Sequence, residues 1–234
     1  GVQTFSSGNT TGIYRSTDGG ATWTNVLSGA PGSDVLFDPS DGSKAYAALG
    51  NPIGASANGV YKSLDGGQTW ARTGVDSLPF FNVGRIVMAI SPVNPSALMI
   101  SISSSASDAS FGSLLGLFTS FNGGQNWSLD PTVPDYCAPQ CWYNNAIRFH
   151  PGSTNFKIVS GISTWRTLGS VWTPHTGGAN GVVLHPDTHA LAFSSTGSKL
   201  YVSNDGGVWS SANPGATIMP WVNLNSTLAI TQFS

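Results

Sequence analysis

The octet S-T-D-G-G-A-T-W, from Ser16 to Trp23, decides the fold because it returns twice along the chain. Its copies are S-L-D-G-G-Q-T-W, from Ser63 to Trp70, and S-F-N-G-G-Q-N-W, from Ser120 to Trp127. Two degenerate copies follow: R-T-L-G-S-V-W ends at Trp172, and S-A-N-P-G-A-T, with an insertion, ends at Trp221. The closing tryptophans are thus 47, 57, 45 and 49 residues apart. This period suits a four-stranded blade and is too long for a leucine-rich or ankyrin repeat.

Short apolar runs recur in phase with the octet. They are rich in β-branched and aromatic residues and bounded by Gly, Pro, Asn and Ser, which is typical of strands. The runs are V-L-F-D-P at 35–39, V-M-A-I-S-P at 87–92, A-I-R-F-H-P at 146–151 and A-L-A-F-S-S at 190–195. We therefore expect each unit to contain an inner strand, a second strand and a third strand such as G-V-Y-K-S. The octet then forms a hairpin turn, and an outer strand begins at the tryptophan.

Composition excludes several classes of protein. The 234 residues include 29 Gly and 14 Pro, only 9% are charged, and all acidic residues are Asp, so the usual residues of surface helices are scarce. Nine Lys plus Arg and a net charge of −2 give no basic surface for nucleic acid. No apolar run is long enough to insert into a membrane. The uncharged, Ser- and Thr-rich character favours an exported, extracellular protein.

The sequence therefore predicts an all-β chain with one domain over residues 1–234, a β-propeller of about five four-stranded blades. The expected units are 1–30, 31–76, 77–133, 134–178 and 179–227. Residues 228–234, L-A-I-T-Q-F-S, are expected to form one more inner strand. That strand either completes the first blade and closes a ring, which we favour, or begins another blade of a larger propeller.

The octet has a structural explanation. Its acidic or amide side chain can accept hydrogen bonds from backbone N–H groups of the turn, its glycines allow positive φ, and its tryptophan can bury a large ring against the neighbouring unit. We interpret these residues as fasteners between strands and not as catalysts: Asp18, Asp65, Asn122, Trp23, Trp70 and Trp127.

The octets resemble the Asp-box, or BNR, repeat of sialidase-like, xyloglucanase-like and sortilin-like β-propellers. The resemblance implies that the boxes lie between the third and fourth strands, on the face opposite the ligand site. A sialidase is not favoured, because that family uses a glutamate and a cluster of three arginines. This sequence has no glutamate, and its five arginines mostly lie in strand-like segments or beside boxes.

Aromatic residues occur in the links that should build the ligand face. Trp142 and Tyr143 follow directly on C-A-P-Q-C, and Phe80 and Phe81 lie in S-L-P-F-F-N. Such rings suit stacking on a sugar, and the alternative is that they only cap the core. We expect Cys137 and Cys141 to form a disulfide that stiffens the loop, in preference to two buried thiols.

A second group lies in H-P-D-T-H. Alternate residues of an extended segment point to one side, so His185, Asp187 and His189 could converge on a divalent metal ion or act as an acid and base pair. A relay of hydrogen bonds that holds the loop is the alternative that we favour. No other cofactor is expected.

The segment Y-V-S-N-D-G-G-V-W, 201–209, imitates an octet but follows a second strand, which places Asn204 and Asp205 on the ligand face. It resembles segments that hold a catalytic Asp in the xyloglucan-cleaving glycosidases. Inverting hydrolysis needs a second carboxyl group, for which no partner matches. Asp205 is thus a catalytic candidate, or else the cap of a Gly-Gly turn.

These features together favour an exported propeller module that binds carbohydrate and is glycosidase-like; as an enzyme it would be a glycoside hydrolase. The alternative is a non-catalytic scaffold that binds another protein chain.

Overall fold

The computed structural model describes residues 11–227, which form an all-β propeller of successive antiparallel sheets. We number the sheets as blades. Blade 1 has two described strands, and each of the other blades has four. The strands are β1 (Gly12–Arg15) and β2 (Thr24–Ser28) in blade 1; β3 (Gly32–Asp38), β4 (Asp41–Leu49), β5 (Gly59–Ser63) and β6 (Ala71–Arg72) in blade 2; β7 (Val83–Ile90), β8 (Leu98–Ser104), β9 (Leu114–Ser120) and β10 (Ser128–Leu129) in blade 3; β11 (Ala146–His150), β12 (Ser153–Ser160), β13 (Thr164–Thr167) and β14 (Trp172–Pro174) in blade 4; and β15 (Thr188–Phe193), β16 (Leu200–Asn204), β17 (Gly207–Ser211) and β18 (Val222–Asn223) in blade 5.

The predicted fold class is confirmed: each of the four-stranded sheets, in blades 2 to 5, follows the expected order of inner strand, two middle strands and outer strand. The closing tryptophans also fall one to a sheet, at or just before β2, β6, β10, β14 and β18. The strand expected over 228–234 lies outside the described residues. Within residues 11–227, no helix has the length and apolar content needed to cross a membrane.

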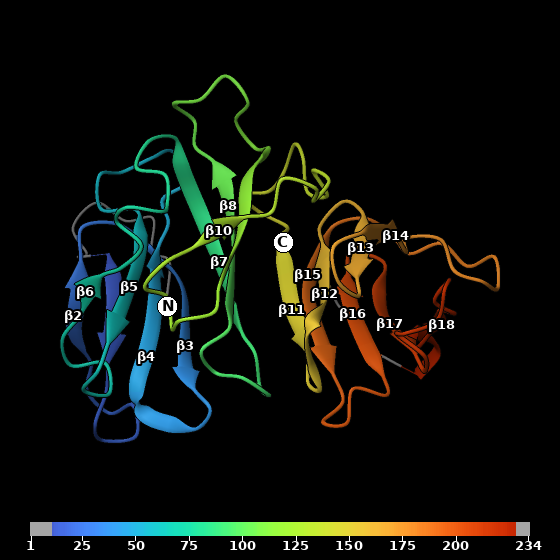
Figure 1. Cartoon of the computed structure of the whole chain (residues 1–234), viewed down its shortest axis with the longest axis horizontal. Coiled ribbons are helices and arrows are strands. Elements are labelled where there is room, and N and C mark those ends of the chain that lie inside the picture. Colours follow the sequence, from blue (N-terminus) through green and yellow to red (C-terminus); the bar gives the residue numbers. More distant parts are fainter. Residues whose placement is uncertain (1–10, 228–234) are drawn as a thin grey trace.

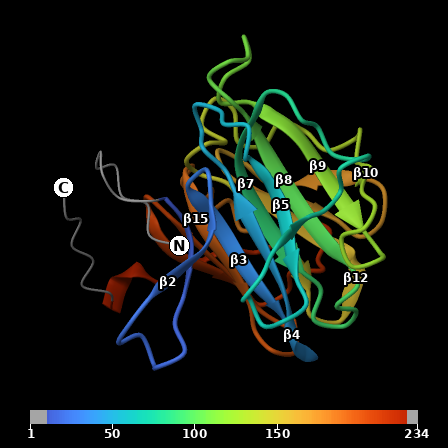
Figure 2. The ribbon, with the colours of Figure 1, turned by 90° about the vertical axis from the view of Figure 1, so that its left-hand side faces the viewer.

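One apolar layer lies between each pair of successive blades. The layer between blades 2 and 3 contains Tyr46, Ile86 and Met88, and that between blades 3 and 4 contains Leu117 and Ile147. Figure 2, seen from the side of blade 1, shows the blades one behind another, and Figure 1 shows blades 1 and 5 at opposite ends of the longest axis. The blades therefore stabilise one another through face-to-face packing.

The inner strand of blade 2 has an uncovered apolar side. Leu36 packs into the layer shared with blade 3, so its neighbours Val35 and Phe37 face blade 1. They are 36% and 54% exposed, whereas Ile86 and Met88, on the next inner strand, are sealed against blade 2. The difference follows from blade 1, which among the described residues has only its outer pair of strands.

The alternation of strand direction divides the turns between two faces (Figure 1). The box face carries the turns from third to fourth strands, which include the octets. The loop face carries the links between blades and the loops from second to third strands. Asp205, between β16 and β17, is therefore on the face opposite Asp18 and Asp65.

The octets are built as the sequence predicts. The Asp65 carboxylate accepts the Thr69 N–H at 2.9 Å and its hydroxyl at 2.5 Å, and Asp18 bonds Thr22 in the same way. These hydrogen bonds hold the pKa values of both carboxyls well below their usual range. In the third octet, the Asn122 side-chain oxygen accepts the Asn126 N–H at 3.0 Å.

The tryptophans pack toward the preceding blade, with one exception. Trp70 contacts the layer shared with blade 1, and Trp127 is buried in the layer shared with blade 2. Trp23 is 60% exposed, because no blade precedes it within the described residues.

Candidate functional site

Two loops of the loop face are tied together beside the disulfide. Cys137 and Cys141 are bonded, as predicted, and both are buried. The Cys141 N–H donates to the Gly112 carbonyl at 2.8 Å, which joins the link between β10 and β11 to the loop between β8 and β9. A Cβ on Gly112 would lie 2.0 Å from the Pro139 carbonyl oxygen, so only glycine allows this approach.

These loops present a line of rings that crosses from blade 3 to blade 5, which we call the aromatic row: Phe111, Trp142, Tyr143 and His189. The ring centroids of Phe111 and Trp142 are 6.3 Å apart, and those of Trp142 and Tyr143 are 5.6 Å apart. The Tyr143 and His189 rings meet edge to face at 5.3 Å. Trp142 and Tyr143 are 37% and 53% exposed, so their surfaces are accessible to a ligand.

A polar pair ends the aromatic row. His189, on β15, and Asp205, in the turn after β16, are joined by a 2.6 Å contact between Nε2 and a carboxylate oxygen. Both side chains are partly exposed, so they could donate to and accept from ligand hydroxyls. The sequence placed both residues on this face; their pairing depends on how β15 and β16 align.

Asn204 has a supporting role beneath this pair. Its amide nitrogen donates to the His185 carbonyl at 2.8 Å, and its oxygen accepts from the Gly206 N–H at 3.0 Å and the Trp209 indole at 3.2 Å. The side chain is buried, and these bonds hold the turn that carries Asp205. Direct contact of Asn204 with a ligand, as predicted, therefore stays a prediction.

The candidate metal residues do not share one centre. His185 Nδ1 lies 2.9 Å from the Pro186 carbonyl oxygen, Asp187 accepts from Asn144 of the preceding link, and His189 pairs with Asp205. Within residues 11–227, the one set of three acidic, histidine or cysteine groups that lie within 4.8 Å of one another is Asp135, Cys137 and Cys141. Its sulfurs are bonded to each other, so they are not free as metal ligands. The hydrogen bond between Asp187 and Asn144 is of the kind expected if this segment holds its loop by a relay of hydrogen bonds.

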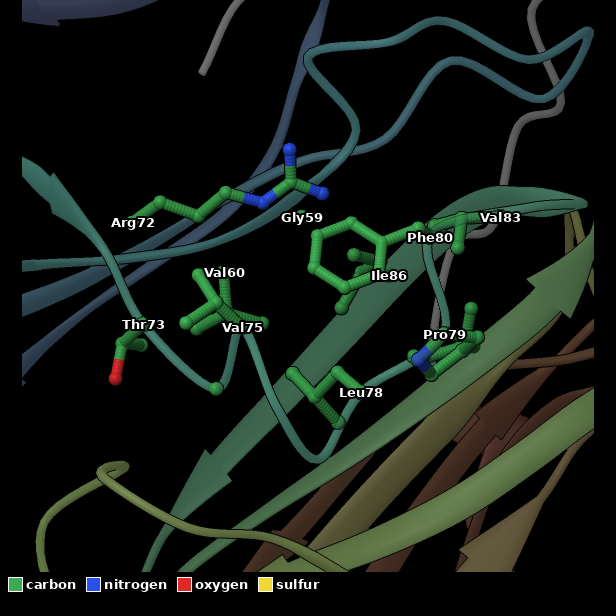
Figure 3. A pocket seen from close by; sticks show the side chains of 12 residues that line it. Gly59, Val60, Arg72, Thr73, Val75, Leu78, Pro79, Phe80, Val83 and Ile86 are labelled. Atoms are coloured by element: carbon green, nitrogen blue, oxygen red, sulfur yellow. The ribbon is translucent and has the colours of Figure 1, made fainter.

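Phe80 and Phe81 belong to a different part of the loop face. Phe80 lines a hollow together with Val60, Leu78 and Pro79 (Figure 3). Its empty volume of about 270 Å³ includes space that is open to solvent. The Arg72 guanidinium carbon lies 5.2 Å from the centre of the Phe80 ring. No ring contact among the described residues links this hollow to the aromatic row, so the four predicted aromatic residues form two separate groups.

Two functional candidates were missed by reasoning from the sequence. Phe111 lies in a long, Ser-rich loop between a second and a third strand, a position that could have identified it. Arg85, on the inner strand β7, donates from Nη1 to the carbonyl oxygens of both Trp142 and Tyr143, the former at 3.4 Å. Nothing local in the sequence marks that contact, because the partners are 57 and 58 residues away.

Charged groups lie on the inner strands next to Arg85. The half-buried Asp34, on β3, accepts from the backbone N–H groups of Met88 at 2.8 Å and Val35 at 2.8 Å. Burial raises the pKa of Asp34, and the charges of Arg148 and Arg85 oppose that rise. Asp34 thus lies in electrostatic contact with Arg85 and Arg148 on the neighbouring inner strands.

Comparisons with known proteins agree on the fold. A model of the BNR/Asp-box repeat matches residues 14–25. The structure is similar to a GH74 enzyme of Niastella koreensis, with 20% identity and a TM-score of 0.64, over 90% of this chain and 34% of that one. It is also similar to a GH74 xyloglucanase of Xanthomonas campestris, with 18% identity and a TM-score of 0.62, over 90% and 35% of the two chains.

A further similar structure is YCF48 bound to a D1 peptide, with 17% identity and a TM-score of 0.51, over 85% of this chain and 56% of that one. No curated protein sequence matches the chain. The chain spans about a third of the length of the two GH74 structures. Identities this low establish architecture and not activity. Together with the stacked sheets, they show that this chain has a β-propeller fold, with a first octet region that is similar to the BNR/Asp-box repeat.

Proposed function

We propose that the loop face binds a glycan along the aromatic row. The observation that carries the proposal is the pair of exposed rings, Trp142 and Tyr143, held beside a buried disulfide and followed by the His189–Asp205 pair. Flat apolar rings can stack on the C–H faces of sugars, while the polar pair can bond hydroxyl groups. The resemblance in fold to a GH74 xyloglucanase makes xyloglucan the first ligand to test.

The test is a set of affinity measurements on soluble polysaccharides, with xyloglucan and unbranched glucans among them. We expect Trp142→Ala and Tyr143→Ala each to weaken binding by about tenfold, the loss of roughly one aromatic contact. Phe121→Ala is the matched control, because Phe121 is an exposed ring in the third octet, on the box face. Absence of binding to every polysaccharide, or equal losses in all three variants, would reject the proposal.

A glycosidase activity is the finer form of the proposal, with Asp205 as acid or base. Its support is the 2.6 Å contact with His189, which can hold the carboxylate in place. Two carboxyl groups flank the cleaved bond in most glycosidases, so the second would come from elsewhere in the chain or from another propeller. Release of reducing ends by the parent protein and its loss in Asp205→Asn would support hydrolysis; no release would leave a binding module.

A scaffold that binds another protein chain is the competing function. It is favoured by the exposed Val35 and Phe37 on β3, and YCF48 is a propeller of similar fold that holds a peptide. Measurement of the mass in solution separates the two proposals. The scaffold is supported if the protein associates, if Phe37→Ser abolishes that association, and if no glycan is bound. We also propose that the protein is exported, in keeping with its disulfide.

A further inference from the structure

The segment that carries the two central rings of the aromatic row is a turn whose last carbonyl groups have no partner within the turn itself. The N–H groups of Tyr143 and Asn144 both donate to the Gln140 carbonyl, at 2.7 and 3.0 Å, so residues 140–144 form one tight turn. In a turn of this kind, the carbonyls that come last have no partner within the turn. The carbonyls of Trp142 and Tyr143 are such groups.

Arg85 supplies the missing donor from another strand. Its Nη1 bonds both carbonyls, and the Arg85 main-chain N–H is itself held by the Ser103 hydroxyl at 2.9 Å. A guanidinium cannot lose its proton at any ordinary pH and has its donors in a rigid plane, so one side chain can hold two consecutive carbonyls. The rings of Trp142 and Tyr143 are attached to the two residues that are held.

The surroundings of Arg85 limit its freedom. Arg85 is half-buried, and the Asp34 carboxylate on the neighbouring inner strand interacts with its charge. Gly50 presses against the same stretch, since a Cβ there would lie 3.0 Å from the Arg85 Cα. The Arg85 backbone is thus closely packed and its charge has a partner before any ligand arrives, which lowers the entropic cost of holding the rings in a binding orientation.

We infer that Arg85 is a positioning residue, which orients Trp142 and Tyr143 for a ligand by capping their carbonyls. The inference rests on the proposed function for its ligand, but its structural part can be tested without one. It assigns Arg85 no contact with the glycan.

Arg148 provides a matched control. It lies on the next inner strand, β11, and also interacts with the charge of Asp34, yet its Nη1 donates to the carbonyl of its own neighbour Ile147 at 2.8 Å. Replacing Arg148 by Ala removes the same charge from the same region and leaves the turn at 140–144 capped. Arg85→Lys keeps the charge and one donor group, so it serves as the conservative variant if Arg85→Ala folds poorly.

The experiment compares the parent protein with Arg85→Ala, Arg85→Lys and Arg148→Ala. Hydrogen–deuterium exchange, without glycan, is measured on peptides that cover 138–145, and glycan affinity is measured separately. We expect Arg85→Ala to raise exchange in this segment by about tenfold, the loss of one hydrogen bond to a charged group, and to weaken glycan binding several-fold. Arg85→Lys should be intermediate, and Arg148→Ala should match the parent in both measurements.

Three outcomes would overturn the inference. Unchanged exchange in Arg85→Ala would show that the cap does not hold the turn. Equal loss of affinity in Arg85→Ala and Arg148→Ala, with unchanged exchange, would show that positive charge acts on the glycan directly. Faster exchange in Arg85→Ala with unaltered affinity, while Trp142→Ala weakens binding, would show that the orientation of the rings is unimportant. If Trp142→Ala leaves affinity unaltered, the proposed function fails, and the exchange data alone decide whether Arg85 holds the turn.

Discussion

His175 is a buried histidine held in its neutral form. Its Nδ1 accepts from the Met219 N–H at 3.4 Å, and its Nε2 lies 3.0 Å from the Thr173 hydroxyl, a pattern that needs a proton on Nε2 alone. The Trp221 indole donates to its carbonyl at 2.8 Å. Burial, with a smaller effect of the Arg166 charge, lowers the pKa of His175 to about 4. The ring therefore resists protonation in the folded protein.

This resistance predicts acid sensitivity. The unfolded chain binds a proton near pH 6.5 and the folded chain only near pH 4, so the stabilisation is complete above pH 6.5 and is lost as the pH falls toward 4. Over this pH range the free energy of unfolding falls by about 3 kcal/mol because of His175. We expect urea unfolding at pH 7 and pH 4.5 to differ much less in His175→Gln than in the parent. His185→Gln, at an exposed histidine, is the control; an unchanged difference in His175→Gln would contradict the prediction.

At this scale the sequence predicts the octet residues well and the aromatic sites only in part. The hydrogen bonds of Asp18 and Asp65 are local, so spacing alone identifies them. The exposure of Trp23 and the separation of Phe80 from Trp142 depend on which blades and loops are neighbours. Such contacts between distant segments are not encoded in any one stretch of sequence.

Cationic side chains link neighbouring octet regions at three of the blade junctions. Arg15 donates to the Gly66 carbonyl at 2.9 Å, Lys62 donates to the Gly123 carbonyl at 2.9 Å, and Arg166 donates to the Pro214 carbonyl at 2.9 Å. Arg15 and Lys62 immediately precede the first residue of an octet, and Arg166 is the first residue of the fourth, degenerate copy. In blade 3 the same position is Thr119, whose buried hydroxyl has no partner among the described residues. The elements of the box face are thus bridged across three of the four blade junctions.

Removal of the hydrogen bond between Lys62 and the Gly123 carbonyl should lower the stability of the protein measurably. Lys62→Ala should lower the free energy of unfolding by about 1 kcal/mol, because a partly buried hydrogen bond from a charged group is removed and the Gly123 carbonyl keeps only the 3.3 Å bond from the Tyr46 hydroxyl. Lys199→Ala is a matched control at an exposed lysine on the box face. Chemical denaturation measures both variants, and equal midpoints would argue against the bridge. The recurrence of Lys or Arg before the octets was visible in the sequence, but the distant carbonyl partner was not.

The packing of the whole molecule places blades 3 and 4 between neighbours on both sides. Blade 1, by contrast, shows only two described strands, and β15 has just one described inner strand beside it. In a linear array of repeats, units with a single neighbour open more readily than units with two. We expect amides of β8 and β12 to exchange with deuterium more slowly than those of β1 and β17. Uniform protection across all blades would contradict this and indicate that the terminal blades have further partners.

The overall architecture could be predicted because it depends on a repeat, which combines many weak local signals. Strand order and the two opposite faces follow once each octet is taken as a turn from third to fourth strand. The residues around the aromatic row could be predicted only in part, since Phe111, Arg85 and Asp34 come from three separate strands or loops. Their proximity results from the stacking of blades and from the geometry of the links.

The octets and their cationic bridges occupy one end of the strands, whereas the rings occupy the other. Changes to a link on the loop face therefore leave the turns that hold the sheets untouched. The scaffold should accept randomised or transplanted links between β8 and β9 or between β10 and β11, provided that Gly112 and the two cysteines are kept. Libraries made in this way could yield binders for new targets from one unaltered frame.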